Sequence, residues 1–458
     1  MGPVFEFPIQ LPARDSRGLL RSLHGQLRAA ILDGRLRPGL RLPSTRRLAG
    51  AYGVSRNTAV AAYDLLLSEG YVVSRRGSGA YVATALPRTQ AKAPPDESAH
   101  ERRLAAHWRD PPGPFITPLV PAPRFEFSLG IPDGTLFPFD IWRRLTSRAL
   151  RAIAKARTTY SQPRGQLALR EGIARHVSFA RAVACVADDV VVTSGAQQAF
   201  DLIARILVTP GRTVVAVENP GYPPQRMAFL AAGAKLAPVR VDTEGLVVER
   251  LPRDARIVCV SPSHQFPLGC AMSARRRAAL LDFAQARGAV VVEDDYDGEF
   301  RFGARPLDAL QTLDRAECVF YVGTFSKSLF PAIRLGYIVA PPWAMRALIA
   351  AKRNADWHSG AIEQETLAAF IAEGHMARHV RRMRTVYAGR RNALLASLKR
   401  DFARWLEPIP SIAGLHLSAY AGASVDVAAL VDAARRNDVG VTSLRSFYTG
   451  APARQGIA

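Results

Sequence analysis

The chain has 458 residues, 61 of them arginine or lysine against 39 aspartate or glutamate, and a formal net charge of +22. Its length exceeds one ordinary domain, and its apolar runs are broken by charge before the roughly 20 residues that a membrane-spanning helix needs. The first residues show no secretory signal, and the four cysteines lack paired spacing or histidine neighbours. We therefore expect a cytoplasmic protein with no membrane segment, disulfide framework or bound metal.

The first 85 residues predict three short helices followed by a β-hairpin. Apolar residues recur at helical spacing over 22–32 and predict the first helix. Ser44 and Ser55 are each placed to cap a further helix, with a glycine turn between the two helices. Alternating residues over 71–82, around a basic and glycine-rich tip, predict the hairpin. This order is typical of a winged helix-turn-helix, which predicts double-stranded DNA as a partner.

The third helix is the expected reading element, because a helix-turn-helix places its second helix in the major groove. Arg56 is the best base-reading candidate, since bidentate pairing of arginine with guanine is the commonest specific contact. The remaining helix-start and hairpin-tip residues suit phosphate contacts or close approach to the minor groove. The predicted DNA-binding residues are Ser44, Arg46, Arg47, Ser55, Arg56, Asn57, Thr58, Arg75, Gly77 and Gly79. The less specific alternative is a small helical cap with a solvated arginine face.

A proline-rich segment over 86–125 predicts an extended linker, apart from a possible helix near 101–108. Beyond it, short β-rich runs alternate with helical segments over 126–458, which predicts an α/β domain with a mainly parallel sheet. The expected strands are Val190–Thr193, Thr213–Val217, Arg256–Val260, Ala289–Glu293, Cys318–Gly323 and Gly336–Ala340. A long amphipathic helix over Arg378–Leu398 is expected to join a smaller C-terminal portion, which begins at about residue 345.

Lys327 is one of six lysines in the chain and follows an apolar strand in the stretch GTFSKS. A lysine at a rigid strand end suits Schiff-base formation with an aldehyde, while nearby hydroxyls and a guanidinium hold a phosphate. Thr324, Ser326 and Arg334 fit the phosphate-holding task. The pattern predicts a site for pyridoxal 5′-phosphate, with Lys327 as the Schiff-base residue and, in an enzyme, the general base.

Further cofactor contacts are predicted at other strand ends. Asp294 is favoured as the acid that keeps the pyridine nitrogen protonated, although Asp295 and Asp297 leave that assignment open. Tyr296, and either His264 or Gln265, are placed near the ring hydroxyl. Tyr222 is predicted to lie over the ring, with a packed loop aromatic as the alternative. A small-residue turn that starts a helix predicts a phosphate cradle. Its residues are Ser194, Gly195, Ala196 and Gln197.

These motifs resemble known families. LRAAILDGRLRPGLRLPSTRRLA, VSRNTAVAAYDLLLSEGY and RRGSGAYVA resemble the winged-helix domains of the GntR superfamily, over nearly all of residues 15–83. EDDYDGEF, GTFSKSLFPAIRLGY, NPGYP and PSHQFP-x-G resemble the fold-type I aminotransferases over roughly 126–458. The combination resembles the MocR/GabR subfamily of GntR regulators. The resemblance implies a multidomain protein with a DNA-binding domain over 1–85, a cofactor Schiff base at Lys327 and a head-to-tail homodimer.

Two departures from the family pattern bear on function. Pro224 stands where some members of the subfamily carry an arginine for an amino-acid carboxylate. Aminotransferases also hold a carboxylate with a C-terminal arginine just before a Leu-Gly-Phe-like stretch, which would be expected to begin at 456–458, and we assign no arginine to that role. Arg445, a nearby candidate, better suits a surface position. The preferred function is a transcription regulator whose large domain senses the cofactor or an amino compound and modulates operator binding. The alternatives are an active aminotransferase with a DNA-binding appendage and a cofactor-free DNA-binding protein.

Overall fold

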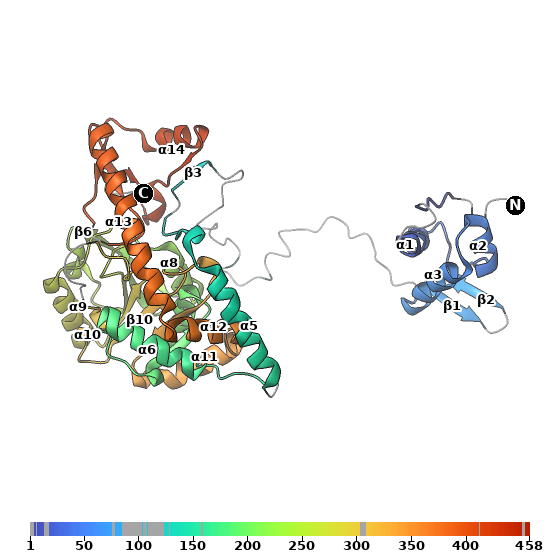
Figure 1. Cartoon of the computed structure of the whole chain (residues 1–458), viewed down its shortest axis with the longest axis horizontal. Coiled ribbons are helices and arrows are strands. Elements are labelled where there is room, and N and C mark those ends of the chain that lie inside the picture. Colours follow the sequence, from blue (N-terminus) through green and yellow to red (C-terminus); the bar gives the residue numbers. More distant parts are fainter. Residues whose placement is uncertain are drawn as a thin grey trace. The chain divides into compact units, whose positions relative to one another are not determined.

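The computed structural model describes residues 4–5, 7–12, 18–75, 78–84, 103, 108, 123–127, 129–156, 159–302, 308–411, 413–450 and 454–458. The chain divides into two compact units, 1–105 and 106–458, and each is described by itself (Figure 1). The linker expected over 86–125 and the possible helix near 101–108 lie mostly outside the described residues. Among the described residues, no helix is long and apolar enough to cross a membrane.

The first unit packs three helices against a two-stranded hairpin. Its elements are α1 (Leu19–Leu32), α2 (Thr45–Tyr52), α3 (Arg56–Ser68), β1 (Val72–Arg75) and β2 (Gly79–Val82). The strands pair antiparallel, with Val72 opposite Val82. Leu23, Leu27 and Ile31 are fully buried, because their spacing places them on one face of α1. The order of elements predicted for a winged helix-turn-helix is confirmed.

Side-chain caps fix where the second and third helices begin. The Ser44 hydroxyl accepts a hydrogen bond from the backbone N–H of Arg47 at 3.2 Å. The Ser55 hydroxyl accepts one from the backbone N–H of Thr58 at 3.0 Å. Gly53 adopts φ +62° at the end of α2, a conformation that glycine accommodates without strain. The turn between α2 and α3 is therefore set by two serine caps and one glycine.

An eight-stranded sheet forms the centre of the second unit. Its strands are β4 (Val190–Thr193), β5 (Val214–Asn219), β6 (Lys235–Asp242), β7 (Gly245–Leu246), β8 (Ala255–Val260), β9 (Val290–Asp295), β10 (Val319–Thr324) and β11 (Gly336–Val339), in the order β4-β11-β10-β9-β8-β5-β6-β7. Strands β10, β9, β8, β5 and β6 pair parallel, whereas β11 is antiparallel to both β10 and β4. The six predicted strands are confirmed. Strands β6 and β7 were not predicted, because charged residues and a proline interrupt β6 and β7 has only two residues.

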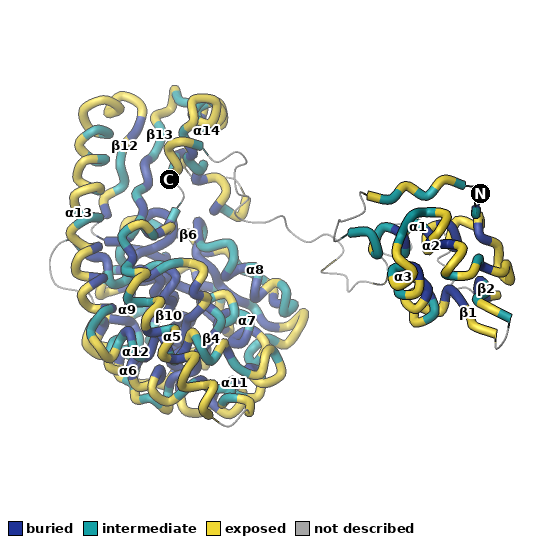
Figure 2. Tube along the Cα trace, turned by 45° about the vertical axis from the view of Figure 1, so that its right-hand side comes forward, coloured by how far each residue is buried: buried dark blue, intermediate teal, exposed yellow. Residues whose placement is uncertain are grey.

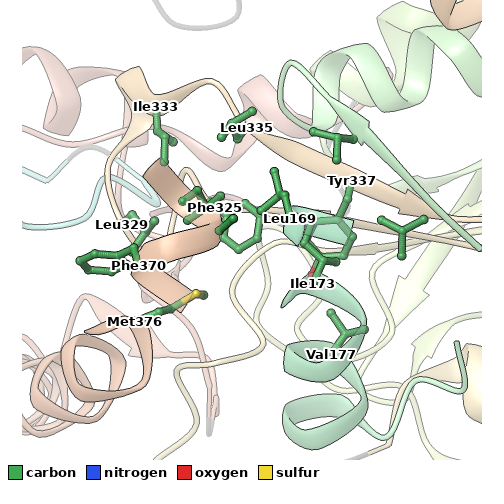
Figure 3. Close-up of a cluster of buried hydrophobic side chains, with 14 of the residues drawn as sticks. Leu169, Ile173, Val177, Phe325, Leu329, Ile333, Leu335, Tyr337, Phe370 and Met376 are labelled. Atoms are coloured by element: carbon green, nitrogen blue, oxygen red, sulfur yellow. The ribbon is translucent and has the colours of Figure 1, made fainter. Parts of the chain in front are cut away.

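Helices cover both faces of this sheet. They are α5 (Phe139–Lys155), α6 (Leu167–Arg181), α7 (Ala196–Leu207), α8 (Pro223–Ala231), α9 (Ala274–Arg287), α10 (Leu310–Leu313), α11 (Pro342–Asp356) and α12 (Ala361–Ala372). Alternate residues of β4 face opposite sides, so Val190 and Val192 join one core cluster and Val191 joins the other. Figure 2 shows the buried strands at the centre of the unit. Figure 3 shows one cluster, with α6 residues on one side and Phe370 and Met376 on the other.

A smaller layer completes the second unit. It contains α13 (His375–Asp401), β12 (Leu406–Pro408), β13 (Ala419–Ala421), α14 (Val427–Arg436), β14 (Val439–Gly440), β15 (Gly456–Ile457) and the early strand β3 (Phe125–Glu126). Strands β12, β13 and β15 form a three-stranded sheet, and β14 pairs parallel with β3. Short 3-10 helices link the elements at Gly134–Leu136, Ala187–Asp189, Val248–Arg250, Pro331–Ile333 and Leu444–Phe447. The long helix predicted over Arg378–Leu398 is confirmed and extends further at both ends.

Candidate functional site

One edge of the large sheet gathers the predicted cofactor residues. Strands β4, β5, β8, β9 and β10 run in the same direction, so their carboxyl ends meet at this edge. Strand β11 runs the opposite way, and its start, next to Arg334, lies at the same edge. A cavity of about 630 Å³ opens there. The predicted residues that line it are Ala196, Gln197, Tyr222, Asp294, Tyr296, Thr324, Ser326, Lys327 and Arg334.

The acidic run at the end of β9 contains one carboxylate oxygen without a partner. Glu293 accepts hydrogen bonds from the backbone N–H groups of Leu310 and Gln311, at 2.8 and 2.9 Å. Asp295 pairs with Arg181, and Asp297 lies 3.0 Å from the Nδ1 atom of His264. Oδ1 of Asp294 is buried and has no hydrogen-bond partner, and the residue lines the cavity. Such an orphaned acceptor fits a protonated ring nitrogen, which favours Asp294 over its two neighbours.

The charge state of Asp294 follows from its burial. Burial raises the pKa of this carboxyl to about 8, and the negative neighbours Asp295 and Asp297 act in the same direction. The ammonium of Lys327 opposes the rise by favouring the carboxylate. Without a bound cation, Asp294 is therefore mostly protonated at neutral pH. A cation placed against Oδ1 would lower its pKa again.

Lys327 projects from the segment after β10 into the same cavity. Burial lowers the pKa of its amine, while Asp297 and Asp294 act in the opposite direction. Gly130 lies against the side chain, and a Cβ at that position would sit 3.2 Å from Nζ. A lowered pKa leaves more of the amine unprotonated, which is the form that attacks an aldehyde. The side chains of Lys327 and Asp294 thus line one cavity, which brings a nucleophilic amine and a carboxyl group to the same site.

The turn between β4 and α7 is built as an anion cradle. Gly195 adopts φ +84° and precedes the first turn of α7, whose free backbone N–H groups favour negative charge. The Arg334 guanidinium donates to the carbonyl oxygen of Ser194 at 2.8 Å. A Cβ at Gly195 would approach that guanidinium to 2.9 Å, so only glycine leaves the arginine in place. Ser194 and Gly195 lie directly beside the lining residue Ala196.

Lys352 supports this turn from behind and was not identified from the sequence. Its ammonium is fully buried and donates to Gln198 Oε1 at 2.7 Å, to Asp356 at 2.7 Å and to Ser359 at 3.0 Å. Gln198 Oε1 also accepts from the backbone N–H of Ser194 at 2.8 Å. The cationic group is thereby linked to the cradle through a single side chain. The i, i+4 spacing of Lys352 and Asp356 was visible in the sequence, but its proximity to Ser194 was not.

Of the predicted ring-hydroxyl partners, Tyr296 lines the cavity, whereas His264 and Gln265 do not. The Tyr296 hydroxyl is 3.0 Å from both the carbonyl oxygen and Nδ1 of His264. His264 also lies 3.2 Å from the Ser411 hydroxyl and does not line the cavity. The Gln265 side chain donates to the carbonyl oxygen of Pro220 at 2.8 Å and serves the loop. Phe266, the next residue, lines the cavity instead. The sequence analysis did not identify Phe266, although it is an apolar residue within the PSHQFP motif.

Aromatic packing and the distribution of cations complete the cavity. Tyr222 lines it and also packs edge-on against Phe266, with ring centroids 5.3 Å apart. Among the described lining residues, the cations are Lys327 and Arg334. Pro224 lies in α8, and Arg445 is exposed and absent from the lining. Within one subunit, the described lining provides no further guanidinium for a substrate carboxylate.

The first unit carries the predicted DNA-binding residues mainly on its surface. Eight of the nine that the structure describes are exposed, and Thr58 is half-buried. The Arg75 guanidinium lies over the Tyr81 ring at 4.7 Å from its centroid. Gly79 adopts φ +107°, opposite Arg75 in the hairpin. Gly77 lies outside the described residues. The exposed start of α3 and the arginine-bearing hairpin are thus available to a polyanion.

Comparison with known proteins matches both units. Residues 126–454 match the family model "Aminotransferase class I and II", and residues 20–82 match "Bacterial regulatory proteins, gntR family". The chain is 38% identical to the probable rhizopine catabolism regulatory protein MocR of Rhizobium meliloti, over 95% of this chain and 88% of that protein.

A second regulator and a solved structure show the same two likenesses. The pyridoxine biosynthesis transcriptional regulator PdxR of Corynebacterium glutamicum is 32% identical, over 99% of this chain and 94% of that protein. A crystal structure of Pyrococcus horikoshii kynurenine aminotransferase superposes with a TM-score of 0.67 at 27% identity, covering 73% of this chain and 84% of that one. Regulators therefore match nearly the whole chain, and the aminotransferase matches the second unit.

Proposed function

This chain belongs to the MocR-type transcription regulators of the GntR family, and we propose that its large domain binds pyridoxal 5′-phosphate as a sensor. The GntR domain makes it a DNA-binding regulator. The observation that carries the cofactor proposal is the orphaned Oδ1 atom of Asp294, buried in the cavity into which Lys327 projects. A buried carboxylate oxygen without a partner is stabilised when a bound group donates a hydrogen bond to it, as a protonated ring nitrogen would.

Each part of the cavity has a task in this proposal. Lys327 holds the cofactor covalently, Asp294 receives the protonated ring nitrogen, and the turn of Ser194 and Gly195 with Arg334 receives the phosphate. Thr324 and Ser326 add hydroxyls to the phosphate side, and Tyr222 lies against the ring. When bound, the cofactor supplies an aldehyde that condenses with primary amines, which allows the domain to recognise an amino compound.

The two cations of the cavity favour a role in sensing the cofactor over catalytic turnover of an amino acid, because both already have another task. Arg334 is committed to the cradle through the Ser194 carbonyl, and Lys327 is committed to the aldehyde. An amino-acid substrate also needs its carboxylate held, usually by a bidentate arginine. The described lining supplies no guanidinium for that task within one subunit. We therefore favour a site that retains the cofactor and responds to it over an efficient aminotransferase.

The response reaches DNA through a difference in affinity between two arrangements of the protein. A ligand shifts such an equilibrium only by the difference between its affinities for the two states. We propose that cofactor or effector binding changes how a cytoplasmic, head-to-tail homodimer presents its two GntR domains to an operator. Arg56 reads bases at the start of α3, while Arg46, Arg47 and Arg75 contact phosphates.

Absorbance spectroscopy tests the cofactor proposal. Purified protein mixed with pyridoxal 5′-phosphate is expected to develop a visible band that Lys327→Ala abolishes. Lys235→Ala removes an exposed lysine and should leave the band unchanged. A band retained in Lys327→Ala would refute the assignment of Lys327.

Two functional assays separate the remaining readings. Binding to duplex DNA from the region beside the protein's own gene is expected to change when the cofactor is added, and equal binding with and without it would refute sensing. Sustained multiple-turnover transfer between an amino donor and an oxo acid would instead establish the aminotransferase alternative.

A further inference from the structure

The positive charge of the large domain is concentrated in two helices. Residues 126–458 contain 43 arginines and lysines and 30 aspartates and glutamates. Helices α5 and α13 together contain 13 of these basic residues and only two acids, Asp140 and Asp401. The rest of the domain is nearly neutral, with 30 basic and 28 acidic residues. A genome-wide preference for arginine would spread the charge evenly, so its location requires a separate explanation.

Six exposed arginines where the two helices approach each other form one basic face. They are Arg144, Arg148 and Arg151 of α5 and Arg378, Arg381 and Arg382 of α13. Glu373, just before α13, contacts one arginine of each helix. Its carboxylate pairs with Arg148 at 2.5 Å, and its carbonyl oxygen accepts from Arg378 at 2.9 Å. The basic face is therefore continuous across both helices.

Helical spacing places the three arginines of each helix on its solvent-exposed side. Arg144, Arg148 and Arg151 follow the i, i+4, i+7 pattern of one helix face, opposite the buried Leu145 and Ala149. On α13, Met376, Val380 and Met383 are buried, and the arginines occupy the other side. Over residues 376–383, beside the arginines, the apolar side of α13 is thus already packed against protein.

Most of the charge on this face is not neutralised. Of its six arginines, Arg148 alone has a carboxylate partner among the described residues. Lys399 is also exposed and lies on the same side of α13, near the C-terminal end of the helix. The exposed surface between Arg382 and Lys399 carries small residues, Gly389, Ala393 and Ala396, which allow close approach of a large, smooth partner. Arg382 and Lys399 are 17 residues apart, or about 25 Å along the helix axis.

We propose that the basic face is a second DNA-contacting surface, which binds the phosphate backbone of a duplex without reading its sequence. Arginine and lysine neutralise phosphates and release counterions, and backbone contacts supply most non-specific affinity. The GntR domain on the same chain raises the local concentration of duplex DNA at this surface. A lipid surface fits the six arginines poorly, because membrane-bound helices insert a free apolar face, and beside these arginines the apolar residues Met376, Val380 and Met383 of α13 are buried. This inference requires only that the chain is a DNA-binding regulator. It does not depend on the cofactor proposal.

Salt-dependent binding of the full-length protein tests the proposal. The probe is a labelled duplex of mixed sequence, about 60 base pairs long, titrated between about 50 and 200 mM salt. The variant Arg381→Gln, Arg382→Gln, Lys399→Gln removes three exposed charges that make no hydrogen bond or ion pair among the described residues. If each contacts a phosphate, the slope of log K against log salt falls in magnitude by up to about 2.7.

A matched control removes the same charge from another part of the domain. Arg212→Gln, Arg250→Gln, Arg253→Gln neutralises three exposed arginines outside α5 and α13 and should leave the slope unchanged. Equal changes in both variants would mean that only total charge matters, which overturns the proposal. An unchanged slope in the α13 variant would overturn it in favour of a protein partner. If that variant unfolds, Arg144→Gln with Arg151→Gln on α5 tests the same face, with an expected fall of up to about 1.8.

Discussion

Replacing Asp294 by asparagine should stabilise the cofactor-free protein against unfolding and lower its affinity for the cofactor. The pKa of Asp294 is raised by burial from its ordinary 3.8 to about 8. Between these values the native carboxyl is protonated and the unfolded one is ionised, so the native state binds more protons. The free energy of unfolding therefore falls as pH rises from about 4 to about 8, and above about pH 8 this contribution is fully lost.

The magnitude follows from the same values. The difference between 3.8 and about 8 corresponds to about 5–6 kcal/mol at the upper end of the window, at about 1.4 kcal/mol per pH unit. The asparagine amide is itself buried without a partner, which costs about 1–3 kcal/mol. We expect Asp294→Asn to raise the free energy of unfolding by about 2–5 kcal/mol at pH 8. Below pH 4 neither side chain is charged, so the gain should vanish and only the cost of the buried amide should remain.

Urea denaturation of the cofactor-free protein between pH 4 and 8, followed by tryptophan fluorescence, measures this difference. Asp295→Asn is the matched control, because Asp295 pairs with Arg181 and accepts from the Tyr321 hydroxyl at 2.7 Å. Asparagine removes the negative charge opposite the buried Arg181 guanidinium, which also donates to the Ser263 hydroxyl, and should destabilise the protein by about 3–5 kcal/mol. With cofactor present, Asp294→Asn should bind about 10- to 150-fold more weakly, since a charged hydrogen bond contributes about 1.5–3 kcal/mol. No gain at pH 8, or unchanged cofactor affinity, would refute the reasoning.

Further predictions concern the cradle and the DNA-binding unit. Gly195→Ala should weaken cofactor binding at least tenfold by equilibrium titration, because the residue has φ +84° and its Cβ would displace the Arg334 guanidinium, and unchanged affinity would argue against the cradle. Arg56→Ala should weaken operator binding by about 1–3 kcal/mol in fluorescence anisotropy and spare non-specific DNA, and equal losses on both DNAs would show that Arg56 reads no base. Ser55→Ala should destabilise the first unit by about 1 kcal/mol in calorimetry because the cap of α3 is lost, while Ser55→Asp should retain the stability.

Local patterns were sufficient for most of the elements. The helix starts at Ser44 and Ser55 were readable because a cap depends on residues only three positions apart. Strands β9 and β10 were readable because each begins with an unbroken run of apolar residues, as expected of strands covered on both faces. Strand β6 was missed because it is only partly buried and its residues do not alternate cleanly. What a strand contacts on each face decides its burial, and that is not a local property.

The sequence by itself determined the two-part architecture, the GntR-type DNA-binding unit and the chemical types gathered at the cofactor edge. It favoured Asp294 but left Asp295 and Asp297 open, since all three are carboxylates within four positions. The tertiary structure adds support for Asp294 by supplying partners from distant segments, Arg181 for Asp295 and His264 for Asp297, and none for Oδ1 of Asp294. It also placed Lys352 behind the cradle and joined α5 to α13 through Glu373. Hydrogen bonding and burial act over a few ångströms in space, whatever the separation along the chain.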